Sequence, residues 1–597
     1  MLKSFIKPCR GLPSLFIDGK QTSAVAYTTY FEERARYSDF IKAGYRIFFI
    51  NLSFTMLPIN PETLFTPFTV GIFEDKDRPE YSEFEASARS ILKECPEAVI
   101  IPRIYISMPR WWVEANPDDV IATPKGDLRE AMFSEKFRAD ASKMLAEVVS
   151  HIKSADYSPR IGGWMICGGT TQEWFYRGFD GGLGRMAEEP YKRHVKETYG
   201  EDGAVLPTRA DYDYRGNPRQ LSENAKRYAL FCNLEMAKTI DIFAEVIKRE
   251  TSYEQIVGTF YGYAFEARIP LFGTYALRHL LTSRNIDFFS SPNAYTRARE
   301  FGIDWADMMP VDAIKHHGKL PFMECDIRTC LTDSVQKARP GRYPDDIYTV
   351  NGVTVWVGPP TPELSRDALR KCFAHQLTKG SAIWWFDMWG GWYDHPLMMD
   401  ALKSMKTIYD KGLSCTKAQP SAEVAFFADE QCYPVNMGGS PQLNAIMDTR
   451  TAMGNTGAPY DSCMVEDAED ILKNYKAAVF PFAVSSEAGE RAMALCERLG
   501  IPYLRATEEH FELTKEEIRN FLKASGVHIY NENYDVVYAG CGYVALHSKF
   551  QGKKTLTLPQ KLKVTPIFGA EDVTVCENVI SFDLAENGTA LFEVEKF

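Results

Sequence analysis

Short apolar runs alternate with longer amphipathic stretches between residues 23 and 387. Residues 46–51 and 320–323 are mostly apolar, which is typical of parallel strands buried on both faces. Residues 137–152 place apolar side chains at the spacing of one helix face. The alternation predicts eight parallel strands separated by helices, and therefore a (β/α)8 TIM barrel. The predicted strands are residues 23–27, 46–51, 98–107, 163–167, 256–261, 286–290, 320–323 and 381–387.

An open doubly wound sheet is the alternative fold for such an alternation. It predicts a glycine-rich phosphate loop after the first strand, and residues 26–30 contain no glycine, so the pattern favours the barrel. Residues 13–22 predict a small hairpin at the bottom of the barrel, with a turn at Asp18 and Gly19. Residues 177–222 are polar and rich in glycine, which predicts a long insertion after the fourth strand.

The pattern changes twice after the barrel. A linker at 414–421 is followed by four short apolar strands with helices between them, which indicates a flavodoxin-like α/β domain. From residue 527 the strands become short and alternating, with frequent turns, which predicts a small C-terminal β-sandwich. The expected domains are the catalytic barrel at 1–413, the flavodoxin-like domain at 420–525 and the β domain at 526–597.

Composition narrows the possible partners. The chain has 597 residues, too many for one core, and a net charge of −12, which argues against nucleic acid. It contains no run of 18 apolar residues, so no membrane span is expected, and its start lacks the apolar segment of a signal peptide. The 13 cysteines form no C-x-x-C pair. We therefore expect a cytoplasmic protein without a metal or cofactor.

Two glutamates follow apolar strands that lie far apart in the chain. Glu173 comes after the fourth predicted strand, and Glu324 ends the seventh. Carboxyl ends of these strands face each other across a barrel mouth, so the two groups can approach the separation of about 5–5.5 Å that retaining glycosidases need. Either glutamate alone is as easily an ordinary loop residue. Together they favour a carbohydrate-cleaving site, with Asp326 as the rival nucleophile.

Several segments resemble a known family. Pro109-Arg-Trp-Trp112, residues 191–200 and residues 535–547 resemble parts of glycoside hydrolase family 42, the β-galactosidases whose barrel is followed by a trimerisation domain. The resemblance covers nearly the whole chain. It implies that Glu173 is the acid/base, that Glu324 is the nucleophile, and that the chain is a trimer acting on a β-galactoside, a related β-linked sugar or an α-L-arabinoside.

The chain departs from that family in two places. Gln172 stands where these enzymes usually have an asparagine whose amide bonds the sugar 2-hydroxyl, and the zinc-binding cysteine cluster of some members is absent. Both departures bear on the particular sugar more than on the retaining mechanism. A glycosidase of the same clan acting on another sugar is therefore an alternative, as are a barrel of other chemistry and a carbohydrate-binding barrel without turnover.

Further candidates lie at or beyond strand ends. Arg103 on the third strand either holds the nucleophile ionised or makes a structural ion pair. Trp174 is expected to shape the wall of the site, and Trp385 and Trp392 to form a sugar platform, although each tryptophan is equally typical of a core. The other expected substrate contacts are the residues that end the fifth and sixth strands, Tyr261 and Tyr295.

Overall fold

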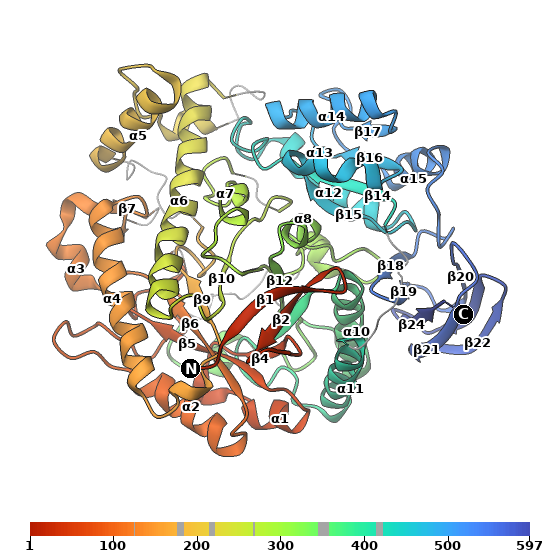
Figure 1. The fold of residues 1–597 in the computed structure, drawn as a ribbon, viewed down its shortest axis with the longest axis horizontal. Coiled ribbons are helices and arrows are strands. Elements are labelled where there is room, and N and C mark those ends of the chain that lie inside the picture. Colours follow the sequence, from red (N-terminus) through yellow and green to blue (C-terminus); the bar gives the residue numbers. More distant parts are fainter. Residues whose placement is uncertain are drawn as a thin grey trace.

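A closed barrel of eight parallel strands lies left of centre in the view of Figure 1, with the two later sets of strands on the right. The computed structural model describes residues 1–61, 63–123, 126–175, 184–213, 221–266, 269–343, 357–413 and 422–596. The strands follow one another round the barrel in chain order, and the last pairs with the first. The predicted TIM barrel is confirmed. Its strands are β4 (Val25–Thr28), β5 (Ile47–Ser53), β6 (Val99–Tyr105), β9 (Trp164–Cys167), β10 (Val257–Phe260), β11 (Phe288–Ser290), β12 (Leu320–Cys325) and β13 (Ala382–Phe386).

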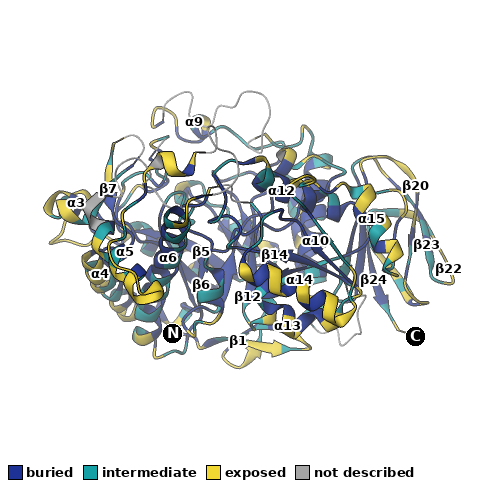
Figure 2. Cartoon of the chain, turned by 90° about the horizontal axis from the view of Figure 1, so that it is seen from above, coloured by how far each residue is buried: buried dark blue, intermediate teal, exposed yellow. Residues whose placement is uncertain are grey.

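Amphipathic helices surround the barrel. Their inner faces are apolar, so the strands are buried while the outer helix faces remain exposed (Figure 2). Side-chain caps begin the longest of them: Ser134, Ser222 and Thr361 each accept a backbone N–H of the first turn. No described helix has the length and apolar character needed to cross a membrane. The main barrel helices are α1 (Tyr37–Lys42), α2 (Ser82–Glu94), α4 (Glu135–Ser154), α6 (Glu223–Glu250), α7 (Leu277–Leu281), α8 (Val311–His316), α10 (Pro362–Lys379) and α11 (Pro396–Leu413).

A three-stranded antiparallel sheet closes one end of the barrel. It consists of β1 (Ser4–Cys9), β2 (Leu12–Ile17) and β3 (Lys20–Gln21), and the predicted turn at Asp18 and Gly19 joins the last two. Leu2 N–H donates to the Ile161 carbonyl over 3.0 Å, just before β9 begins. The sheet therefore covers the amino ends of the barrel strands, and the carboxyl ends remain for the site.

The second domain has its own parallel sheet and its own core. The strand order is β15-β14-β16-β17, which places the second strand beside the first, as in flavodoxin-like folds. The predicted flavodoxin-like arrangement is confirmed. The elements are β14 (Val424–Ala428), α12 (Pro441–Gly454), β15 (Asp461–Met464), α13 (Ala468–Ile471), β16 (Ala477–Phe480), α14 (Glu487–Leu499), β17 (Tyr503–Arg505) and α15 (Lys515–Ala524).

Two antiparallel sheets form the predicted C-terminal β-sandwich, which packs on α10. His375 of α10 stacks on Tyr538 with ring centroids 4.5 Å apart. The domain limits at 413, 420 and 526 stay a prediction, since the linker at 414–421 lies outside the described residues, and the insertion at 177–222 is described only in part, including α5 (Gly184–Tyr199). The sandwich strands are β18 (Val536–Gly540), β19 (Tyr543–His547), β20 (Gly552–Thr557), β21 (Lys563–Phe568), β22 (Ala570–Cys576), β23 (Val579–Leu584) and β24 (Thr589–Glu595).

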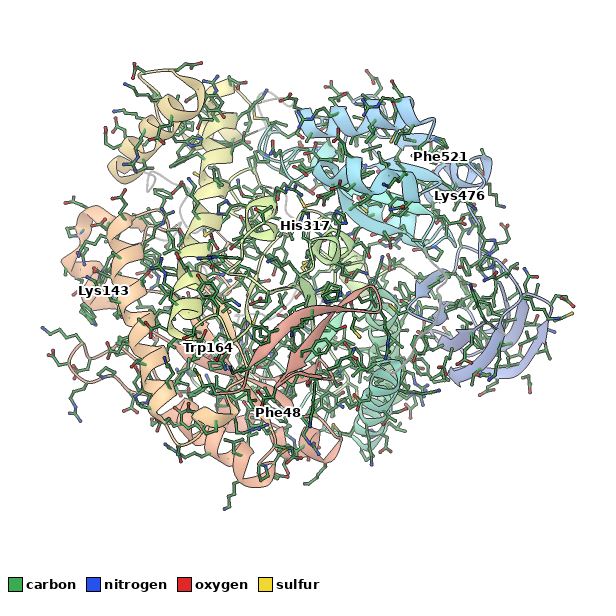
Figure 3. The ribbon with its side chains drawn as sticks, in the orientation of Figure 1. Phe48, Lys143, Trp164, His317, Lys476 and Phe521 are labelled. Atoms are coloured by element: carbon green, nitrogen blue, oxygen red, sulfur yellow. The ribbon has the colours of Figure 1, made fainter. Side chains whose placement is uncertain are left out.

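Carboxylates at the end of the second domain's sheet hold that domain against the barrel. Glu430, which follows β14, accepts hydrogen bonds from the backbone N–H groups of Leu277 (2.6 Å) and Arg278 (3.2 Å) at the start of α7. Asp467 pairs with Arg278 and, over 2.9 Å, with His317, which lies at the boundary of the two domains (Figure 3). Burial, with the nearby Glu466 charge, raises the pKa of Glu430 to about 8.

This raised pKa predicts a falling stability at alkaline pH. The stability that Glu430 contributes is fully present below the unfolded pKa of about 4.3 and is lost as the pH rises through its folded pKa of about 8. Glu430→Gln should therefore flatten the fall in melting temperature between pH 5 and pH 9, measured by calorimetry. The exposed control Glu469→Gln should keep the wild-type slope, and an unchanged slope for Glu430→Gln would contradict the assignment.

Candidate active site

Glu173 stands on a tightly bent turn that follows β9. Thr171, Gln172 and Trp174 all have left-handed backbone conformations, with φ of +57°, +72° and +61°. Each costs on the order of 1 kcal/mol in a residue other than glycine, and such strain is concentrated at functional sites. The Trp174 ring fills the space where a side chain at Gly168 would lie, because a Cβ there would come within 2.3 Å of the ring. The turn thus folds back onto the barrel and presents Glu173 at its mouth.

Glu324 is the penultimate residue of β12, inside the barrel wall. Its N–H donates to the Ser291 carbonyl over 3.0 Å, and it lies opposite Trp384 in the register of β12 and β13. The side chain is only 5% exposed, and within the described part of the chain no group donates a hydrogen bond to its carboxylate. A buried acid without protein donors is free to contact a bound ligand.

The two glutamates occupy one electrostatic environment. Burial raises the pKa of Glu173, against hydrogen bonds from Thr171 and Tyr263 that lower it. Burial, followed by the charges of Asp326 and Glu173, raises the pKa of Glu324. The charge of Glu173 is thus one of the causes that raise the pKa of Glu324. The structure therefore brings together the two acids singled out in the sequence.

Arg103 forms the floor beneath this pair. Its guanidinium carbon lies 5.1–5.3 Å from the centroids of four aromatic rings: Tyr30, Phe260, Trp384 and Phe386. Its Nε and Nη1 have no hydrogen-bond partner within the described residues. Its charge lowers the pKa of Glu173 and Glu324 alike. Arg103 therefore faces the acids as a cation held among aromatic rings, with two guanidinium nitrogens that have no partner among the described residues.

Asp326, the rival nucleophile, is already fully engaged. Its Oδ1 accepts from Arg299 over 2.6 Å, and its Oδ2 accepts from Arg328 and from the Tyr295 hydroxyl. Although burial opposes it, the two guanidinium charges lower the pKa of Asp326. An acid held by three donors has no oxygen left for attack on a substrate. Tyr295, which we expected to touch the nucleophile or the sugar, donates its hydroxyl hydrogen to Asp326.

Two further polar side chains at the mouth lack partners. Both amide atoms of the buried Gln172 have no hydrogen-bond partner among the described residues, and neither has the indole Nε1 of Trp392. Trp392 lies 5.2 Å from the Arg328 guanidinium, beside the Asp326 network. Unpaired buried donors are costly, so their presence at the mouth indicates ligand contacts. Within the same residues no three metal-binding side chains come together.

Three residues that we expected to contact the substrate make contacts elsewhere in the fold. The Tyr261 hydroxyl donates to the carbonyls of Gly273 (2.8 Å) and Asn233 (3.2 Å), away from both acids, because Tyr261 follows the end of β10 and turns toward α6. Trp174 packs behind the turn and donates to Thr259 Oγ1 over 2.9 Å. Trp385 points out of the barrel, since neighbouring residues of a strand alternate in direction and Trp384 points inward, where its Nε1 donates to Ser290.

Two hydroxyl groups that the sequence analysis missed contact Glu173. Tyr263 donates to Glu173 Oε1 over 2.7 Å, and the Thr171 hydroxyl lies 2.6 Å from Oε2. The proximity of Tyr263 was not readable from the strand pattern, since it lies beyond β10, where alternation no longer gives direction. The double threonine before Gln172 carried a weak signal, because hydroxyl residues commonly bond the backbone of turns.

The arrangement of barrel, second domain and sandwich is similar to that of glycoside hydrolase family 42 structures. No family model and no curated protein matches the chain. The β-galactosidase from Rahnella sp. R3 has a TM-score of 0.65 at 11% identity, with 96% of this chain and 99% of that chain covered. A catalytic mutant of Gan42B, a GH42 β-galactosidase from G. stearothermophilus, gives 0.64 at 9% identity, covering 96% and 98%.

An exo-carrageenase of the same family from Bacteroides ovatus gives a TM-score of 0.58 at 11% identity, with 100% of this chain and 86% of that chain covered. The fold is therefore similar to that of these family 42 structures, a (β/α)8 barrel followed by two smaller domains. At identities of 9–11% in these three comparisons, the likeness is one of fold, and the site residues must be judged by their own geometry.

The engagement of Asp326 predicts a structural role for this residue. Asp326→Asn removes the counter-charge of two buried arginines, which should lower the free energy of unfolding by about 3–5 kcal/mol. Glu324→Gln is the matched control at the same strand end. It removes a charge whose pKa is raised by burial, so its stability should be unchanged or greater. Urea denaturation measures both, and a fully stable Asp326→Asn protein would contradict the role.

Proposed function

We propose that the chain is a retaining exo-glycosidase that removes a terminal β-galactoside-like residue by double displacement. The observation that carries the proposal is the pair of glutamates at the barrel mouth, Glu324 in β12 and Glu173 on the turn after β9, where the charge of Glu173 acts on Glu324. Unpaired buried donors surround this pair, as a site for a polyhydroxylated ligand requires. The likeness of the whole chain to family 42 β-galactosidase structures supports the same reaction class.

In the proposed reaction, Glu324 attacks the anomeric carbon while Glu173 gives its proton to the leaving oxygen. Water, deprotonated by Glu173, then releases the sugar from Glu324. Burial raises the pKa of both glutamates and the charge of Arg103 lowers both, so the division of roles follows the family resemblance.

The unpaired donors are the proposed substrate contacts. Gln172 precedes the acid/base and would bond a ring hydroxyl, and the Trp392 indole would bond or stack on the sugar. Both are buried and lack partners within the described residues. Gln172 in place of asparagine also supports the second candidate, a glycosidase of the same clan that acts on a different sugar. The trimer and the cytoplasmic location are proposals that rest on the resemblance and composition alone.

The nucleophile assignment predicts the outcome of one substitution. Glu324→Gln should abolish release of nitrophenol from the preferred glycoside, by at least about 1000-fold in kcat, because the amide cannot form the glycosyl-enzyme. A panel of nitrophenyl β-D-galactoside, β-D-fucoside, β-D-glucoside and α-L-arabinoside identifies the sugar in the same experiment. Wild-type activity in Glu324→Gln would show that Glu324 is not the nucleophile. If the wild-type protein hydrolyses none of these glycosides, the result would favour another sugar class or binding without turnover.

The acid/base assignment predicts a dependence on the leaving group. Glu173→Ala should lower kcat/KM about 10²–10⁴-fold for a poorly activated alkyl glycoside and much less for a dinitrophenyl glycoside, which needs no proton. Azide should then accelerate the variant and give a glycosyl azide of retained configuration, because it attacks from the side that Glu173 has vacated. Product configuration, read by nuclear magnetic resonance, checks this, and an inverted azide would exchange the roles of the two glutamates.

A further inference from the structure

Asp387 directly follows β13 and is completely buried. Its Oδ1 accepts a hydrogen bond from the backbone N–H of Trp392 over 2.8 Å. Its Oδ2 accepts from the N–H of Gly391 over 2.8 Å and from the Tyr27 hydroxyl over 3.0 Å. A buried carboxylate therefore binds the backbone of the turn that leads away from β13.

The turn between Asp387 and Trp392 follows a closely fixed path. Gly390 N–H donates to the Asp387 carbonyl over 2.9 Å. Gly390 and Gly391 have φ values of +78° and +88°, which glycine adopts without steric cost. A Cβ at Gly390 would come within 2.5 Å of Arg34, so the chain lies directly against that residue. Because the turn ends at Trp392, its path decides where the indole lies.

The backbone of Trp392 is held from two neighbouring strands. Its N–H is bound by Asp387, and its carbonyl accepts from the hydroxyl of Thr329, in the segment that follows β12. β12 and β13 pair with each other in the barrel. Trp392 is only 1% exposed, and its indole Nε1 has no partner among the described residues. The two backbone bonds therefore fix the position of an indole whose polar group the protein leaves unpaired.

We propose that Asp387 is a positioning residue for substrate binding, because its carboxylate fixes the backbone of Trp392 and thereby holds the indole where it contacts the sugar. The inference rests on the proposed function, which assigns a sugar contact to Trp392. Asp387 itself takes no part in bond breaking, since both of its oxygens are occupied by protein donors. Its contribution should therefore appear in substrate binding more than in the chemical step.

The arrangement requires an ionised carboxyl group. Three donors share its two oxygens, whereas an asparagine amide and a protonated carboxyl each offer only one strong acceptor oxygen. Burial raises the pKa of Asp387 to about 6, although the hydrogen bonds from Trp392, Gly391 and Tyr27 lower it. The hold on Trp392 should therefore weaken as the pH falls through about 6. The charged and titratable groups that face Asp387 are Tyr27 on β4, Arg36 before α1 and Tyr393 beyond the turn.

The experiment compares Asp387→Asn, Trp392→Ala and the double variant with the full-length wild-type chain. Asparagine keeps the shape of aspartate but can accept at one oxygen only. Tyr27→Phe is the matched control, because it removes one donor to the same carboxylate and leaves both backbone bonds of the turn in place. The values of kcat and KM are measured from pH 5 to pH 8 on the nitrophenyl glycoside that the wild type prefers. Thermal melts verify that each variant is folded.

At pH 7, Asp387→Asn should raise KM about 5–30-fold, the size expected for one lost hydrogen bond to a charged group, while kcat changes less than about 3-fold. Trp392→Ala should raise KM at least as much, and the double variant no further, because the asparagine acts through the indole. Tyr27→Phe should keep the wild-type KM. Multiplicative effects in the double variant, or a lower melting temperature with an unchanged KM, would overturn the proposal.

The pH dependence of KM provides a second readout. The wild-type KM should rise as the pH falls below about 6, whereas Asp387→Asn should show its raised KM at every pH, because its side chain does not titrate. Tyr27→Phe should move the wild-type rise to higher pH, since the hydrogen bond that it removes lowers the pKa of Asp387. A rise of the same size below pH 6 in Asp387→Asn would assign it to other acids and reject the role of Asp387.

A third measurement does not depend on turnover. Acrylamide quenches the fluorescence of accessible indoles, and the contribution of Trp392 is obtained by subtracting the signal of the same protein with Trp392→Phe. This contribution should be protected in the wild type at pH 7, because Trp392 is only 1% exposed, and should become quenchable in Asp387→Asn. Equal protection in both proteins would reject the positioning role. Absence of glycoside hydrolysis by the wild type would reject the proposed function instead, so the two failures are distinguishable.

Discussion

The placement of two glutamates at one barrel mouth, where little water reaches them, is the constraint on which the rest of the site depends. An isolated buried carboxylate is costly, and a second one nearby adds repulsion to the loss of water. The charge of the Arg103 guanidinium, which is held among aromatic rings, offsets part of this cost for both glutamates. The hydroxyls of Thr171 and Tyr263 offset part of it for Glu173 by hydrogen bonding to its carboxylate. A site so arranged holds at least one proton at rest, and a double displacement begins from that state.

The barrel makes this crowding possible because its strands converge. β9 and β12 are separated by two strands of the closed sheet, yet their carboxyl ends meet at one mouth. The amino ends are covered by the sheet of β1 to β3, which leaves one end for chemistry. The second domain and the sandwich pack on the outside, through Glu430 and Asp467 on one side and Tyr538 on the other. They add stable scaffolding without supplying any of the described residues around the two acids.

Much of the fold was predictable because it is encoded locally. Each barrel strand is an apolar run between helices, and Glu324 could be placed because it ends such a run. The direction in which a side chain points, either within a strand or beyond its end, was harder to predict. Trp384 and Trp385 are chemically alike neighbours, and only the register of the closed barrel decides that the first points inward. Tyr263 rather than Tyr261 meets Glu173 because the chain turns after Phe260. Beyond the end of a strand, contacts depend on loop geometry that periodicity does not encode.

Three acids lie at this barrel mouth, and they differ in which cationic side chains contact them. Asp326 takes two arginines and a tyrosine hydroxyl, so its charge is neutralised and its oxygens are occupied. Glu324, two residues earlier, has no protein donor within the described residues, although the charge of Arg103 acts on it. If the arginines had bound Glu324 directly, the free-energy cost of burying its charge would be smaller, but the carboxylate would be a weaker nucleophile. By compensating Asp326, the protein keeps positive potential near the site while leaving Glu324 unbonded, which is the state that a nucleophile requires.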